Sequence, residues 1–314
     1  MKNKKTIILI ALIISIVAII EVLIFFVFNN NKNKTTDKKE NNSQENFTYT
    51  PPLYKICDND SCVHVMGTIH LGDSKVNKLS KKTLDIYNNS DKLAVEVDIT
   101  NESININDYI AEPGKSIDDL ASSELKEKLK SFEKTNSMFI YNTLKIYKPS
   151  FISEYISSLL YIDAGYTESG VDSYLLDLAH KENKPIISLE TMEEQEEFLY
   201  GYSDDFYLNQ IDTLIDQYSI GKTAIILLYQ SYINGNIDTL KETIDNDIDD
   251  NNSEEYKQYI NALYTERNNK MTNKVKEFLA NNENVLVAVG SAHVIADDGI
   301  VEQLKNDYKI ERIK

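Results

Sequence analysis

The chain has 314 residues, enough for one large domain or two smaller ones with a complete hydrophobic core. Its formal net charge is −17, although residues 1–50 carry seven lysines against four acidic residues, a net of +3. The rest of the chain therefore carries −20, and because phosphate binding needs a clustered basic face and we find none, the composition argues against a nucleic-acid partner.

The first predicted element is a membrane-spanning helix over residues 6–28. This run is almost wholly apolar, with Glu21 as its only charge, and 23 residues of helix are about 34 Å long, enough to cross a bilayer. The run ends at Phe28 without the small residues of a cleavage site, so we interpret it as a retained signal anchor, with a cleaved signal as the alternative. The lysines within residues 1–5 favour a cytoplasmic N-terminus, although four more lysines follow the span.

A tether and a single domain follow the anchor. Residues 29–50 are rich in Asn, Lys, Thr and Glu and have little to bury, which predicts a disordered tether. We therefore divide the chain into a cytoplasmic N-terminus (1–5), a transmembrane anchor (6–28), the tether (29–50) and one domain (51–314). This topology places the domain outside the cell membrane.

The domain begins with a predicted hairpin. Two apolar runs, 53–56 and 63–66, flank the turn-forming residues 58–61. Cys57 and Cys62 bracket this turn and could form a disulfide, which would fit an external location. In a cytoplasmic protein the same pair would be free thiols or half of a metal site.

Two apolar runs lead into the same Gly-x-x-His pattern, as Gly67-Thr68-Ile69-His70 and as Gly290-Ser291-Ala292-His293. Buried strands appear in a sequence as continuous runs of β-branched residues. In open α/β sheets the binding crevice lies at the ends of the strands. The repeat predicts that the two imidazoles share one site, whereas a lone strand histidine is more often an ordinary core residue. We leave His64, inside its strand, and His180, late on a helix, outside this site.

Segments typical of helices and strands alternate between the two motifs. The sequence predicts a helix over 74–89, a strand over 92–99, helices over 116–162 and from Val171, a strand over 184–190, amphipathic helices over 204–280, and a last strand over 308–313. Thr191 is expected to cap the acidic helix that follows it. This alternation predicts an α/β or mixed α+β body.

Two charged residues lie between the motifs and are candidates for the same site. Glu96, in the middle of the strand over 92–99, either faces water with Asp98 or points into the same crevice as His70. Arg267 lies between Leu263 and Met271, and from spacing alone we expect it on a helix surface.

Taken in order, these residues resemble the TraB/GumN (TraB/PrgY/GumN) family, which is related to the Tiki proteins. The resemblance covers residues 51–314 and rests on an ordered set of segments: Pro52-Leu53-Tyr54-Lys55-Ile56 leading into Met66-Gly67-Thr68-Ile69-His70, Val95-Glu96-Val97, Gly170-Val171-Asp172, Leu189-Glu190-Thr191 with Gln195, Arg267-Asn268, and Gly290-Ser291-Ala292-His293 with Gly299. The run between His293 and Gly299 departs from the Leu-x-Gly run usual in the family.

The resemblance implies a mixed sheet wrapped by helices, similar to erythromycin esterases and the haem-binding ChaN proteins. It also implies a crevice that holds both histidines, Glu96, Glu190 and Arg267. Tiki members are regarded as metal-dependent peptidases at the cell surface, so the resemblance suggests a membrane-anchored, extracytoplasmic metallohydrolase. Its substrate would be a peptide or small molecule outside the membrane, and its oligomeric state is left open.

In this interpretation His70, His293 and Glu96 hold a divalent ion, because imidazole and carboxylate are the usual ligands of Zn²⁺, Mn²⁺ and Co²⁺. Glu96 or Glu190 acts as a general base, and Arg267 holds a substrate carboxylate or the developing oxyanion. Asp172 either caps its helix or joins the site.

Two other classes stay open. The first is a non-catalytic binder, either of a peptide pheromone, as with PrgY-type members, or of haem through an axial His or Tyr. The second is a metal-independent esterase in which a histidine and a glutamate activate water.

Overall fold

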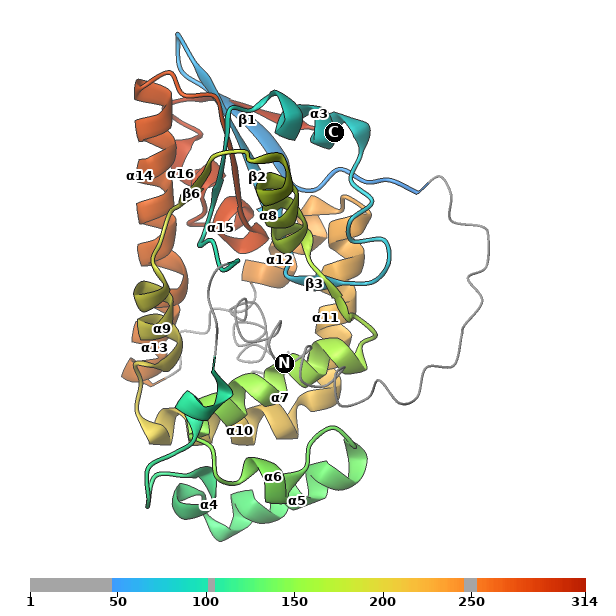
Figure 1. Ribbon diagram of the computed structural model, residues 1–314, viewed down its shortest axis with the longest axis vertical. Helices are drawn as coiled ribbons and strands as arrows, with labels where there is room; N and C mark the ends of the chain where they lie inside the picture. The colour runs from blue at the N-terminus through green and yellow to red at the C-terminus, as the bar shows by residue number, and fades with distance from the viewer. Residues whose placement is uncertain (1–46, 101–104, 246–252) are drawn as a thin grey trace.

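The computed structural model describes residues 47–100, 105–245 and 253–314. Its centre is a six-stranded mixed sheet in the order β6-β4-β7-β2-β1-β8 (Figure 1). The strands are β1 (Leu53–Cys57), β2 (Cys62–Thr68), β4 (Lys92–Val95), β6 (Ile186–Ser188), β7 (Val285–Gly290) and β8 (Lys309–Ile313). Neighbours from β6 to β2 run parallel, whereas β1 is antiparallel to both β2 and β8. A mixed α/β fold is therefore confirmed.

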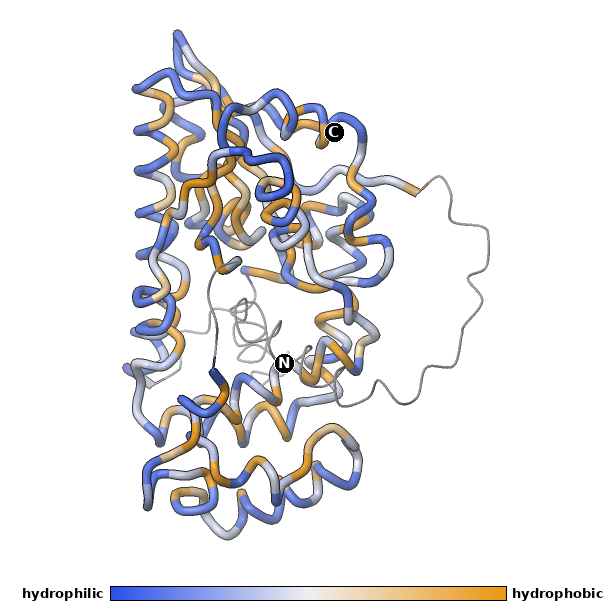
Figure 2. The backbone as a smooth tube through the Cα atoms, viewed as in Figure 1, coloured by the Kyte–Doolittle hydropathy of each residue, from blue (hydrophilic) through white to orange (hydrophobic). Residues whose placement is uncertain are grey.

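The middle of the sheet is buried on both faces. All six residues of β7 are buried, as parallel strands covered by helices on both sides must be. The helices α8 (Val171–Glu182) and α15 (Ser291–Ile295) contact β7, and α14 (Arg267–Ala280) contacts β2. Figure 2 shows the strands as mostly apolar and the outer turns of α14 as hydrophilic.

A second group of helices lies away from the sheet, in the lower half of Figure 1. It comprises α4 (Ile117–Leu120), α5 (Ser123–Thr135), α6 (Tyr141–Leu144), α7 (Pro149–Asp163), α10 (Asp204–Asp216) and part of α11 (Tyr218–Ile233). The hairpin of α11 and α12 (Ile237–Asp245) joins the two halves, because α11 packs on α7 while α12 packs on α15.

Shorter elements complete the described chain. They are α3 (Lys81–Asn89), the two-stranded sheet of β3 (Leu71–Gly72) and β5 (Glu168–Ser169), η1 (Ile106–Tyr109), α9 (Met192–Tyr200), α13 (Glu254–Ile260), the π-helical η2 (Asn261–Glu266) and α16 (Ile300–Leu304). Thr191 caps α9 in a capping box with Glu194, as predicted. Cys57 and Cys62 are joined by a disulfide at the turn of the β1–β2 hairpin.

Three predicted elements were wrong in extent. The strand predicted over 184–190 spans only Ile186–Ser188, so Glu190 follows the strand instead of ending it. The strand predicted over 92–99 stops at Val95, and Leu93, Ala94 and Val95 are all buried, so both faces of β4 are covered. Glu96 therefore follows the strand instead of alternating within it. The helix predicted over 74–89 begins only at Lys81, where the Ser80 hydroxyl accepts the Thr83 N–H.

The N-terminal segment is described only from Phe47. Tyr49, which we assigned to the tether, is 5% exposed and pairs its backbone with Lys78 and Ser80, so the folded part begins before residue 51. No helix among the described residues is both long and apolar enough to span a bilayer. The predicted anchor over 6–28 and most of the tether lie outside those residues.

Candidate functional site

One edge of the sheet gathers the candidate residues. Strands β2, β4, β6 and β7 run parallel, so their carboxyl ends meet at the same edge. His70 follows β2, Glu96 follows β4, Glu190 follows β6 and His293 follows β7. The ladder pairs Thr68 with Gly290, which brings the two Gly-x-x-His units side by side.

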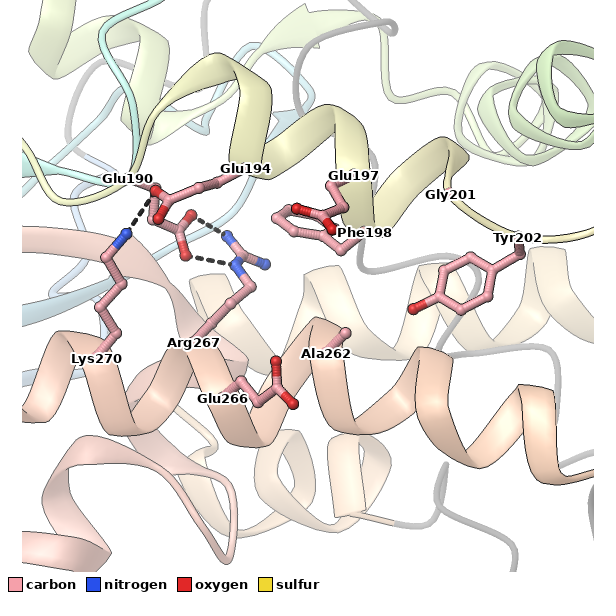
Figure 3. A pocket seen from close by; sticks show the side chains of 10 residues that line it. All are labelled: Glu190, Glu194, Glu197, Phe198, Gly201, Tyr202, Ala262, Glu266, Arg267 and Lys270. Carbon is pink, nitrogen blue, oxygen red and sulfur yellow. Dashed lines mark hydrogen bonds and ion pairs between the residues drawn. The ribbon is translucent and has the colours of Figure 1, made fainter.

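Arg267 joins the two glutamates in a buried ion triad. Its Nε donates to Glu190 Oε1 at 2.8 Å, and its Nη2 donates to Glu190 Oε2 at 2.9 Å and to Glu96 Oε2 at 2.6 Å. The guanidinium also stacks 4.4 Å from the ring centre of Phe198 (Figure 3). Arg267 is only 7% exposed, so the expectation of a surface arginine was wrong.

The π-helical segment η2 ends immediately before Arg267. Such segments widen the helix by one residue per turn and are frequent at functional sites. Here the helix aims two successive side chains into the site, since Arg267 faces the glutamates and Asn268 faces His293. A regular helical pattern read from the sequence does not predict this.

His70 is oriented by Asp172. The imidazole Nδ1 lies 3.1 Å from Asp172 Oδ2, and because a carboxylate only accepts, Nδ1 is the donor and Nε2 keeps its lone pair. Gly170 makes this contact possible, since an added Cβ would lie 1.9 Å from the Ile69 carbonyl oxygen. The amides of Gly170 and Val171 instead donate to His70 O and Ile69 O, which docks the start of α8 against the end of β2.

His293 is oriented through a longer chain of hydrogen bonds. Its Nδ1 lies 2.7 Å from Asn268 Oδ1, and Asn268 Nδ2 donates to Asp298 Oδ1 at 2.8 Å. Thr265 donates to the other oxygen of Asp298. The amide orientation makes Nδ1 the donor, so the Nε2 lone pair of His293 faces Glu96 Oε1 at 3.8 Å.

Gly290 marks the point at which the three groups meet. An added Cβ there would lie 3.2 Å from Glu96 Oε1, 3.5 Å from His293 Cδ2 and 3.9 Å from His70 Nε2. The Gly290 N–H also donates to Glu96 Oε1 at 2.7 Å. Glycine therefore leaves open the space that both imidazoles and one carboxylate surround.

The electrostatics give the two histidines different protonation behaviour. Burial lowers the pKa of His70, but the adjacent Asp172, with Glu96, outweighs it and raises the pKa above its usual range. Burial, together with the charge of Arg267, lowers the pKa of His293 to about 3, so this ring stays neutral. Burial raises the pKa of Glu96, but Arg267 and the other neighbours outweigh it, and the pKa is lowered.

Two cavities border the ion triad. A cavity of about 380 Å³ opens between α9 and the η2–α14 helix and is lined by Glu190, Arg267, Phe198, Tyr202 and Lys270, among others (Figure 3). A much smaller one, of about 20 Å³, is lined by His70, Glu96 and Asp172. A volume of several hundred Å³ is typical of small-molecule sites.

The described residues do not form a ready metal site. No three His, Cys, Asp or Glu side chains in the described ranges are placed so that together they could hold a metal ion. The carboxylates are already hydrogen-bonded: Arg267 donates to both oxygens of Glu190 and to one of Glu96, and the Gly290 amide donates to the other. The Nε2 atoms of the two histidines are further potential metal ligands, because each ring uses its Nδ1 for the hydrogen bond that orients it.

Fold and site together define an α/β protein with a histidine, glutamate and arginine cluster at the ends of parallel strands. The chain belongs to the TraB/PrgY/gumN family, whose model matches residues 52–312. Comparison with curated proteins and with solved structures gives no significant match.

Reading the sequence missed the residues that hold the histidines in place. The role of Asp172 was left undecided, and neither Asn268 nor Asp298 was assigned to the site. A signal did exist, because Asn268 directly follows Arg267 in the family-like segment and Asp298 directly precedes Gly299. Only the contacts between these segments reveal their function.

Proposed function

We propose that this chain is a membrane-anchored hydrolase of peptides or small molecules, with its domain outside the membrane. The observation that carries the proposal is the pair of imidazoles whose Nδ1 atoms are bound to Asp172 and Asn268, with their Nε2 atoms near Glu96. A histidine held by a carboxylate, with its other nitrogen free, is the usual arrangement of a general base. The disulfide between Cys57 and Cys62 supports an oxidising, external location.

In the proposed reaction His70 is the general base. Its Nε2 takes a proton from water, the resulting hydroxide attacks the substrate carbonyl, and the imidazolium then protonates the leaving group. Asp172 stabilises that imidazolium, which fits the raised pKa of His70. Arg267 keeps Glu96 ionised and fixed beside the water, and neutral His293 limits repulsion against the protonated His70.

The larger cavity supplies the proposed site for the charged groups of the substrate, whereas His70 and Glu96 line the smaller cavity. The larger cavity combines cationic Arg267 and Lys270 with Glu194, Glu197 and Glu266 and with two aromatic walls. Such mixed charge suits a zwitterionic chain such as a peptide, whose carboxylate and amine need opposite partners. Lys270 and Glu194 already pair across its rim, so substrate binding would exchange this ion pair for contacts with the ligand.

A divalent ion is a further part of the proposal. The Nε2 atoms of His70 and His293 are suitable donors, and both rings have the second hydrogen bond that usually orients metal-bound histidines. Glu96 would add a third ligand through a lone pair that its hydrogen bonds to Gly290 and Arg267 leave open, after a shift towards the two imidazoles. Once bound, the ion would lower the pKa of its water and polarise a carbonyl.

The metal-independent form of the reaction is the second candidate. One observation favours it, namely that Arg267 and the Gly290 amide already hold Glu96 at the position where it would assist His70. A metal-free hydrolase needs only this base and carboxylate, whereas the metal-dependent form needs a rearrangement of Glu96.

The test uses the full chain in mild detergent, assayed on a peptide library and on ester substrates. Metal content is measured in parallel, and activity is compared with chelator and with added Mn²⁺, Co²⁺ or Zn²⁺. His70→Ala and His293→Ala are compared with His180→Ala, because His180 lies on the surface and pairs with Asp98.

Hydrolysis lost in both site variants and kept in the control would support the proposal, and chelator sensitivity would separate its two forms. A folded wild-type chain that hydrolyses nothing would overturn it. Peptide or haem binding without turnover would then identify a non-catalytic binder.

A further inference from the structure

A third cavity lies between His70 and the hairpin of α11 and α12. Its volume is about 30 Å³, and its walls come from the end of β2, the start of α15 and the two helices of the hairpin. The apolar side chains that line it include Ile69, Leu228, Leu240, Ile244 and Ala292. We call this cavity the apolar pocket.

The apolar pocket adjoins the reactive end of the proposed site, because His70 and Gly290 also line it. An added Cβ at Gly290 would lie 3.9 Å from His70 Nε2 and 3.2 Å from Glu96 Oε1, so Gly290 lies beside the proposed base. A group held in this pocket would therefore lie next to the carbonyl on which His70 acts. Ligand sites often occur where two parts of a fold meet, as the sheet and the second group of helices do here.

The walls of the apolar pocket are held in place. Tyr232, which also lines it, donates from its hydroxyl to Gly67 O at 3.0 Å and packs its ring edge-on against Tyr49. The Ser291 hydroxyl, on the opposite helix α15, donates to Thr68 O at 2.8 Å. Because these two hydroxyls already donate to backbone carbonyls, the pocket attracts a ligand chiefly through its apolar walls.

The size of the pocket limits what it can hold. A cavity of roughly 10–15 Å³ accommodates one water, so 30 Å³ has room for about two, or for a methyl or ethyl group. The longer, branched side chain of leucine would have to push the buried walls apart, and such overpacking is unfavourable. The pocket therefore fits the side chain of alanine better than that of leucine or phenylalanine.

We propose that the apolar pocket binds the side chain of the residue that carries the scissile carbonyl, and that it selects a short aliphatic side chain such as that of alanine. This inference rests on the proposed hydrolase function and adds the substrate class to it. It makes Leu240 and Ile244, on α12, residues that determine specificity without taking part in the chemistry.

The first test varies the substrate. The full chain in mild detergent is assayed on peptides and esters that differ only in the residue that carries the scissile carbonyl, which is Gly, Ala, Leu or Phe. One carbon more or less in an apolar pocket changes kcat/KM by about tenfold or more. We expect kcat/KM for Ala to exceed that for Gly, and that for Leu or Phe, by at least about tenfold.

The second test widens the pocket. Leu240→Ala should raise the ratio of kcat/KM for Leu to that for Ala by at least about tenfold. Ile244→Val removes a single carbon, so it keeps the chain folded if Leu240→Ala does not, and should raise the ratio by about threefold. The matched controls are Leu214→Ala and Ile211→Val, which remove the same groups from buried positions on α10 and should leave the ratio within about twofold of wild type.

A crystal structure of the full chain with propionamide provides a readout that is independent of activity. This amide carries an ethyl group on its carbonyl, and we expect that group between Leu228 and Leu240 with the carbonyl beside Gly290. Propionamide bound elsewhere or not at all, or equal kcat/KM for all four residues, would overturn the inference and leave the proposed function standing. A wild type that hydrolyses nothing but holds propionamide in the pocket would overturn the proposed function, while the preference of the pocket for short aliphatic groups would stand.

Discussion

Removing the charge of Arg267 tests how much the buried ion triad contributes to the stability of the domain. Arg267→Met would leave Glu96 and Glu190 buried without the three hydrogen bonds, at 2.6–2.9 Å, that now compensate them. Breaking a buried pair by removing one partner costs about 3–5 kcal/mol, because the remaining charge is uncompensated. We expect a loss of this size in the free energy of unfolding at pH 7.

The pH dependence of this loss has a defined sign. In the wild type the pKa of Glu96 is lowered, so its ionisation contributes stability above its ordinary pKa, and this is lost as the pH falls. In Arg267→Met burial becomes the dominant influence and raises the pKa, so protonation relieves the unpaired charge at low pH. The difference between the two proteins should therefore shrink between pH 7 and pH 5.

Urea unfolding followed by circular dichroism measures these differences. Arg267→Lys is the graded control, since it keeps the charge but loses the bidentate contact with Glu190 and should fall between wild type and Arg267→Met. The double variant Glu190→Gln/Arg267→Met should recover part of the loss. A cost below about 1 kcal/mol for Arg267→Met, or the same cost at both pH values, would refute the reasoning.

Three further predictions follow from the same geometry. Asp172→Asn removes the charge that raises the pKa of His70, so the acidic limb of the kcat/KM profile should move to lower pH; an unmoved limb would contradict the role of Asp172. His293 is buried as a neutral ring with a pKa of about 3, against an ordinary 6.5, so its contribution to stability is complete above pH 6.5 and is lost as the pH falls towards 3. His293→Leu should accordingly reduce the slope of the unfolding free energy against pH in that range by up to about 1.4 kcal/mol per pH unit. Equal slopes in the variant and the wild type would contradict the burial of His293 as a neutral ring. Gly170→Ala should destabilise the domain by about 1–3 kcal/mol in thermal unfolding, because the new Cβ meets the backbone of Ile69, and a neutral effect would show that α8 can shift.

The sequence allowed the strand-end histidines to be placed because both signals are local. A β-branched run that ends in glycine predicts a buried strand and its end, and two such runs with the same Gly-x-x-His spacing predict two imidazoles at strand ends. Thr191 illustrates the same point, since a cap depends only on the residues that immediately follow it. The mixed α/β class was predictable for the same reason.

Glu96 and Arg267 show where local patterns stop being informative. Alternation placed Glu96 inside a strand, but β4 is covered on both faces and ends one residue before it. Helical spacing placed Arg267 on the surface, because such spacing cannot indicate that two carboxylates, 77 and 171 residues away along the chain, face it.

The sequence by itself therefore determined the elements and the kinds of side chain at their ends. The tertiary structure decided their partnerships: Asp172 with His70, Asn268 and Asp298 with His293, and Arg267 with both glutamates. The physical reason is that a strand or a cap is stabilised by neighbours in sequence, whereas a buried charge is stabilised only by groups that the register of the sheet and the packing of the helices bring within hydrogen-bond distance.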